Sequence, residues 1–311
     1  MKILVFVFLC MNISLNVWAA PKPACAEFQR VLNTQWQELT HSYKKVDSRF
    51  KKLESGNSPF MISKSSTDLV ILLHGYLGSP FEMNRIAASL KTKGYSVLND
   101  LIPGYGFSAR VANQYTEDYW DRYFDTRYKA AFQCYKRVHM IGFSTGGLII
   151  HKFLKTNPKH KAASVHLISP FFAPTLKFVS MLTEWFSLIK TEVSLNLLYY
   201  STFGAKELKI MLMYPNYYLQ DAPYLNMNEI VKSGNEVVQM KSLEKNLSPV
   251  VLYATKKDLV MDFDVTTKMV ARDFVNPRLV NYSETQAPHH LFRHEVSEVA
   301  LKFEKTLLSA F

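Results

Sequence analysis

A short glycine-rich motif with a central serine is the first feature of the sequence that could carry chemistry. Residues 142–147 read G-F-S-T-G-G, between an apolar run typical of a strand and a periodic stretch typical of a helix. A serine on a tight strand-to-helix turn needs flanking positions with almost no side chain, which Gly142 and Gly146 supply. The helix N-terminus beneath the turn favours negative charge. Because G-x-S-x-G also arises by chance, the motif predicts a nucleophile at Ser144 only if partners follow.

Candidate partners for the serine lie later in the chain, in the order acid and then base. A serine hydroxyl needs a histidine to take its proton and a carboxylate to orient that histidine. Asp258 lies just beyond a strand-like run, and we prefer it to Asp262 and Asp264 on the same loop. After the last strand-like run, His289 and His290 are adjacent, and the residues alone leave open which one is the base.

The same histidines permit a second interpretation, a metal site with His294. Adjacent histidines on a loop seldom converge on one ion, and the serine chemistry already accounts for them. We therefore expect no metal.

A second glycine motif, H-G-Y-L-G at residues 74–78, follows the most apolar strand-like run. Attack on an acyl group creates a tetrahedral oxyanion, which two fixed N–H groups must stabilise. We expect one from Thr145, directly after the nucleophile, and the other from Tyr76. His74 is expected to brace this loop structurally.

Around these motifs, strand-like and helix-like patterns alternate. Strands are predicted at 69–73, 95–98, 138–141, 165–168, 250–254 and 279–282, and helices at 80–93, 116–132, 145–156, 263–274 and 294–308. Such alternation predicts an α/β fold with a mostly parallel sheet covered by helices on both faces.

One region interrupts the alternation. Residues 171–246 show no clear strand pattern, and they begin with an amphipathic helical pattern at 176–189 that is followed by many tyrosines. We interpret this region as a helical cap inserted into a core formed by residues 59–170 and 247–311. The apolar positions of the pattern either line an acyl pocket or pack the cap on the body; they are Leu176, Val179, Leu182, Phe186 and Ile189.

The N-terminus predicts export. Lys2, an apolar run too short to span a bilayer and small residues near position 20 together indicate a signal peptide at residues 1–20, with an uncleaved anchor as the alternative. Two cysteines then remain, Cys25 and Cys134, which an oxidising compartment would allow to pair or which stay as free thiols. The protein is expected in the periplasm or the medium.

Residues 21–58 are expected to form an amphipathic N-terminal helix. Its stripe, spaced three and four apart, runs from Phe28 to Leu53 and favours packing on the main body over contact with a membrane or a partner. The net charge of +11 would favour transient contact with anionic membrane surfaces, although a merely basic surface is the preferred explanation. No nucleic-acid-binding motif accompanies the charge, so we expect no such partner.

The motifs together resemble the α/β-hydrolase superfamily, within it the bacterial carboxylesterase and monoacylglycerol-lipase branch grouped with the serine aminopeptidase-like hydrolases. The resemblance covers residues 68–311 and rests on five segments: 72–79, 103–108, 142–147, 258–260 and 290–295. In that branch an acid stands five positions after the base, which fits His290 with Glu295 and carries the role to His290. Two departures are Tyr105, where the family commonly has histidine, and a cap without a match.

The resemblance implies a serine hydrolase that cleaves carboxylic esters, including lipid-like ones, with Ser144, Asp258 and His290 as the triad and no cofactor. An aminopeptidase-like activity is the first alternative, for which Glu184, Glu192 and Glu207 are the available acidic anchors. A non-catalytic binding protein on the same fold is the second. The sequence leaves the acyl chain, the alcohol and the oligomeric state open.

Overall fold

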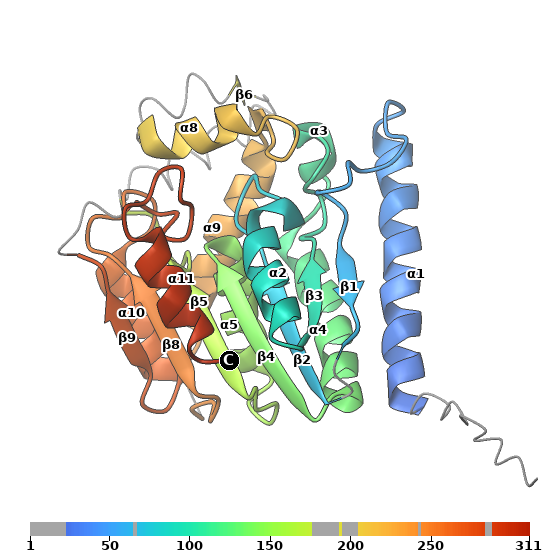
Figure 1. Cartoon of the computed structure of the whole chain (residues 1–311). Coiled ribbons are helices and arrows are strands. Elements are labelled where there is room, and N and C mark those ends of the chain that lie inside the picture. The colour runs from blue at the N-terminus through green and yellow to red at the C-terminus, as the bar shows by residue number, and fades with distance from the viewer. Residues whose placement is uncertain (1–22, 65–66, 176–192, 195–204, 242–243, 284–287) are drawn as a thin grey trace, which may run out of the picture.

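The structure is a computed structural model that describes residues 23–64, 67–175, 193–194, 205–241, 244–283 and 288–311. One seven-stranded sheet forms the centre, in the order β1-β3-β2-β4-β5-β8-β9 (Figure 1). Only β1 runs antiparallel to its neighbour β3; the other pairs are parallel. The strands are β1 (Phe60–Ile62), β2 (Asp68–Leu73), β3 (Ser96–Asp100), β4 (Arg137–Phe143), β5 (Ser164–Ile168), β8 (Val250–Ala254) and β9 (Arg278–Asn281).

All six predicted strands are confirmed. Every residue of β2 is buried, because its run of leucine, valine and isoleucine suits a strand covered on both faces. β1 was not predicted, since three half-buried residues are too few to show a periodic pattern.

Helices cover both faces of the sheet (Figure 1). Helices α2 (Asn84–Thr92) and α11 (Ala300–Leu308) pack on one face, through Leu90 and Phe303 among others. On the other face lie α4 (Glu117–Cys134), α5 (Thr145–Thr156) and α10 (Phe263–Asp273). Two short helices lie in loops: the 3-10 helix η1 (Pro80–Met83) and α3 (Ala109–Ala112).

The last predicted helix begins later than the sequence suggested. Its pattern starts at residue 294, but α11 begins at Ala300. The amides of Arg293, Val296 and Ala300 bond carbonyls three residues back, so this stretch forms successive turns.

The N-terminal helix α1 (Pro23–Val46) packs along α4 at the edge of the molecule (Figure 1). The predicted stripe does face the main body, with Phe28, Leu39 and Tyr43 buried. The helix ends at Val46, however, and Phe50 and Leu53 are buried beyond its end.

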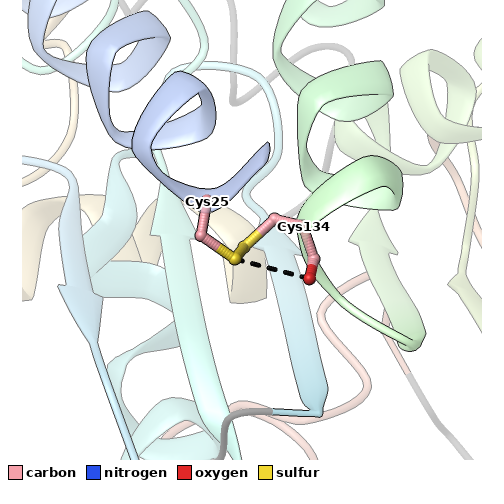
Figure 2. Close-up of a disulfide and its surroundings, with 2 residues drawn as sticks. All are labelled: Cys25 and Cys134. Carbon is pink, nitrogen blue, oxygen red and sulfur yellow. Dashed lines mark hydrogen bonds between the residues drawn. A yellow bond between two sulfur atoms is a disulfide. The ribbon is translucent and has the colours of Figure 1, made fainter. Parts of the chain in front are cut away.

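A disulfide fastens the start of α1 to the end of α4. The Sγ atoms of Cys25 and Cys134 are bonded, with Cα atoms 4.5 Å apart (Figure 2). Of the two alternatives left by the sequence, the paired state is therefore the one in the structure. The bond joins residues 109 positions apart, so it anchors a helix that otherwise stands outside the sheet layers.

The described part of the predicted cap contains two helices and a small strand pair. These are α8 (Ala205–Met213), α9 (Tyr224–Gln239) and the pair β6 (Val193–Ser194) with β7 (Asp221–Ala222). Figure 1 shows α8 above the carboxyl ends of the parallel strands. The predicted amphipathic segment at 176–189, with its five apolar positions, lies outside the described residues, as does the predicted signal peptide.

Candidate active site

The serine motif forms a strained turn between β4 and α5. Ser144 has φ 49° and ψ −115°, a conformation that non-glycine residues rarely adopt. A Cβ on Gly142 would lie 2.6 Å from the Gly146 carbonyl oxygen, and one on Gly146 would lie 2.4 Å from that of Leu73. Both flanking glycines are thus required by backbone contacts, as the motif predicted. A strained serine conformation that closely packed neighbours maintain is typical of a nucleophile elbow.

The second glycine motif lies directly against this turn. A Cβ on Gly75 would lie 3.3 Å from the Cβ of Ser144 and 2.8 Å from the Phe143 ring. Tyr76 follows in the same loop, and Thr145 opens α5, where first-turn amides have no acceptor within the helix. The two residues predicted to supply oxyanion donors are therefore on segments that meet at Ser144.

Asp258 bonds a histidine, and that histidine is His289. Asp258 Oδ2 lies 2.7 Å from His289 Nδ1, and both side chains are buried. The other carboxylate oxygen accepts the amides of Val260, at 2.8 Å, and Met261, at 3.1 Å. Because a carboxylate accepts, the proton of the imidazole is on Nδ1, and Nε2 is left as the basic nitrogen.

The predicted pairing of Asp258 with His290 is therefore wrong. His290 points to a different carboxylate: its Nε2 lies 3.3 Å from Glu82 Oε1. The two imidazoles flank Phe143, the residue before the serine, with ring centroids 5.0 Å away for His289 and 4.8 Å for His290. Consecutive residues of this bent loop project in different directions, and the family spacing to Glu295 favoured the histidine that does not contact Asp258.

The rival carboxylates have structural roles or face solvent. Asp262 caps α10, accepting the Val265 amide at 2.9 Å, and Asp264 is exposed in the first turn of that helix. Asp258 is thus the one of the three that contacts a histidine of this segment.

His74 braces the glycine loop, as predicted. Its Nδ1 lies 2.8 Å from the Gly75 carbonyl oxygen, while its Nε2 accepts the Ile102 amide at 3.1 Å. Burial lowers its pKa to about 4 despite the nearby Glu82. A neutral imidazole with both nitrogens occupied is suited to support rather than to proton transfer.

Glu82 is the residue of this region that the sequence did not single out. It is 2% exposed and accepts the amide of Gly75 at 2.7 Å and the hydroxyl of Tyr218 at 3.0 Å, besides its contact with His290. One feature of the sequence could have indicated its burial. Glu82 lies between the apolar residues Phe81 and Met83 at the start of a helix, and an acid in such a place needs hydrogen-bond partners if it is buried.

The three histidines considered as metal ligands separate to three carboxylates: His289 to Asp258, His290 to Glu82 and His294 to Glu304. Within the residues that the structure describes, no group of three His, Cys, Asp or Glu side chains could hold a metal ion. In the same residues, we find no helix with the length and apolarity needed to cross a bilayer.

Comparison with solved structures identifies the fold. A structure described as "LipS and LipT, two metagenome-derived lipolytic enzymes" is 14% identical, with a TM-score of 0.66 over 83% of this chain and 98% of that chain. A monoacylglycerol lipase from Paleococcus ferrophilus has a TM-score of 0.65 at 14% identity, over 84% of this chain and 98% of that one. A monoglyceride lipase from Saccharomyces cerevisiae has 0.60 at 14%, over 85% and 96%. These TM-scores establish the α/β-hydrolase fold, whereas identities of 14% do not establish the substrate.

Sequence comparison identifies the family. No curated protein matches the chain significantly. The family model described as serine aminopeptidase, S33, matches residues 64–292, which include both glycine motifs, Asp258 and the histidine pair. Because this match spans most of the chain and agrees with the fold, the protein belongs to the serine aminopeptidase S33 family of α/β-hydrolases.

Proposed function

We propose that this protein is an exported serine esterase in which Ser144, His289 and Asp258 form the catalytic triad. One observation carries the proposal: the Asp258–His289 pair, buried beside the residue that precedes a strained serine. The predicted triad is revised at one position, with His289 in place of His290, because the orienting carboxylate contacts His289.

The proposed reaction proceeds through an acyl-enzyme. His289 Nε2 takes the proton of the Ser144 hydroxyl, and the serine oxygen attacks the ester carbonyl carbon. The backbone N–H groups of Tyr76 and Thr145 stabilise the oxyanion. The imidazolium then protonates the leaving alcohol as the carbon–oxygen bond breaks. Water, deprotonated by His289, attacks the acyl-enzyme; the acid is released and Ser144 regains its proton.

Labelling and kinetics of one variant test the proposal. A fluorophosphonate probe should label the wild-type protein and leave Ser144→Ala unlabelled, and the variant should lose roughly 10⁴-fold or more in kcat/KM on p-nitrophenyl butyrate. Ser169→Ala, another buried serine with positive φ, is a matched control that should keep its label. Wild-type protein that neither labels nor hydrolyses esters would point to a non-catalytic binding protein.

We propose esters of medium or long acyl chains as substrates. The printed descriptions of the relatives, lipolytic enzymes and monoacylglycerol lipases, support this choice. A series of p-nitrophenyl esters from acetate to palmitate should give the highest kcat/KM beyond the shortest chains. Hydrolysis limited to acetate would contradict the lipid part of the proposal.

The family description supports a peptidase as the second candidate. Such an enzyme would anchor a free amino terminus by a carboxylate of the cap; the side chains of Glu184, Glu192 and Glu207 lie outside the described residues. Proline and alanine p-nitroanilides would distinguish the two, since an aminopeptidase cleaves them and an esterase of this kind does not.

We also propose export and contact with anionic lipid. The disulfide supports an oxidising compartment, and five exposed basic residues near the end of α1 support electrostatic attraction: Lys44, Lys45, Arg49, Lys51 and Lys52. Mass spectrometry of the protein recovered from cell fractions should find the mature N-terminus near residue 20 outside the cytoplasm. The fraction of protein that sediments with phosphatidylglycerol vesicles should fall as the salt concentration rises. Binding that does not depend on the salt concentration would contradict the electrostatic proposal.

A further inference from the structure

Glu82 is a meeting point of three segments that are far apart in the chain. Its carboxylate accepts the Gly75 amide from the loop after β2 and the Tyr218 hydroxyl from the region before α9, and it contacts His290 Nε2 from the segment after β9. The Glu82 side chain is 1% exposed, so these contacts are shielded from water. A buried carboxylate with several donors is held strongly, because each charge-assisted bond is strengthened where the dielectric is low.

The charge state of Glu82 matches its donors. Burial by itself would raise the pKa of this carboxyl. The hydrogen bond and the electrostatic interaction with His290, followed by the bond from the Gly75 amide, hold the pKa of Glu82 below its usual value instead. The ionised carboxylate can accept from all three donors at once, whereas a protonated or amide side chain would lose part of this capacity.

The loop that Glu82 holds is the one proposed to stabilise the oxyanion. The Gly78 amide bonds the Gly75 carbonyl at 3.3 Å, and Leu77 within that turn has φ 64°. A Cβ on Gly78 would lie 3.0 Å from Glu82 Oε2, so the turn wraps closely around the carboxylate. Gly75 donates its amide to Glu82, which fixes the His74–Gly75 peptide, and the next peptide along the chain carries the Tyr76 amide. A conformation with positive φ at leucine is costly and persists only where its surroundings hold it.

Three consecutive residues before α9 complete this support. The Leu219 amide bonds the Leu77 carbonyl at 2.9 Å, the Ser79 hydroxyl bonds the Tyr217 carbonyl at 3.0 Å, and Tyr218 bonds Glu82. The rings of Tyr217 and Phe81 stack with centroids 3.8 Å apart. The glycine loop therefore takes its shape from residues 217–219 as well as from the core.

We propose that Glu82 is a positioning residue of the hydrolase. It fixes the oxyanion loop through Gly75, and through Tyr218 it couples the conformation of that loop to the position of residues 217–219. This inference rests on the proposed function. It assigns to Glu82 an effect on the transition state through the Tyr76 amide, without contact with the substrate. Loss of an oxyanion donor lowers the rate and leaves ground-state binding largely intact, so the expected signature is in kcat rather than in KM.

The experiment compares two pairs of variants in the full-length mature protein on p-nitrophenyl butyrate. Glu82→Gln should lower kcat roughly 10- to 100-fold, and Tyr218→Phe about 3- to 10-fold, each with KM within about twofold of wild type. The matched controls are Glu295→Gln and Tyr214→Phe, because Tyr214 donates to Glu295 at 2.9 Å without involving the glycine loop. The controls should keep kcat within about twofold.

Thermal unfolding of each variant separates misfolding from mispositioning. If Glu82→Gln does not fold, the kcat of Tyr218→Phe decides. A kcat near the wild-type value in the folded Glu82 and Tyr218 variants, an equal fall in the Glu295 pair, or an effect confined to KM would overturn the inference and leave the esterase proposal intact. A wild-type protein without esterase activity and without labelling of Ser144 would overturn both.

Discussion

His289 and His290 are adjacent in the chain, and each has a buried carboxylate, yet the two pairs belong to different parts of the molecule. The partner of His289 is Asp258, in the loop after β8, and the partner of His290 is Glu82, in the helical turn after β2. Besides His289, the Asp258 carboxylate accepts backbone amides of its own loop, from Val260 and Met261, whereas the Glu82 carboxylate also accepts the hydroxyl of Tyr218 from the cap region. Under our two proposals, these identical neighbours have different roles: His289 transfers the proton, and His290 belongs to the support of the oxyanion loop.

Replacing each of the two histidines by alanine is the strongest test of this comparison. His289→Ala should lower kcat/KM by roughly 10⁴-fold, because the base is lost, whereas His290→Ala should lower it by about tenfold through the loop that Glu82 supports. Steady-state hydrolysis of p-nitrophenyl butyrate measures both. A larger loss in the His290 variant would reverse the two roles.

The carboxylate of the first pair gives the next largest effect. Asp258→Asn should lower kcat by roughly 10³- to 10⁴-fold with little change of KM, because an amide can hold the imidazole in the wrong tautomer. Asp262→Asn is the control on the same loop. Because asparagine caps a helix about as well as aspartate, that change should keep the cap of α10, alter the free energy of unfolding by less than about 1 kcal/mol, and leave kcat unchanged. Similar kinetics in the two variants would argue against Asp258 as the orienting acid.

A third histidine, His74, sharpens the comparison through stability rather than catalysis. Its pKa is lowered to about 4 by burial, so between pH 6.5 and pH 4 the unfolded chain binds a proton that the folded protein does not. Stability is therefore complete above about pH 6.5 and falls as the pH decreases, by about 3 kcal/mol across the window. Urea unfolding at pH 7.0 and pH 4.5 should show a smaller pH dependence in His74→Gln than in the wild type. An equal change in the free energy of unfolding between the two pH values in both proteins would mean that His74 is not held neutral.

Much of the fold followed from the sequence. The runs in β2 and β4 and the periodic pattern in α5 are local and repeated, so each identifies its element without knowledge of its neighbours. Irregular or short segments escaped this reasoning. β1 was missed and α11 was started too early, because turns and three-residue strands leave no period to count.

The sequence by itself determined the elbow at Ser144, since only glycine at 142 and 146 allows the backbone contacts of that turn, and this requirement is local. Only the tertiary structure decided that Asp258 contacts His289, that Cys25 meets Cys134 and that Glu82 joins three segments. The physical reason is that these contacts depend on the directions in which loops leave the sheet. Adjacent or distant residues of the same type are equivalent in the sequence until packing fixes those directions.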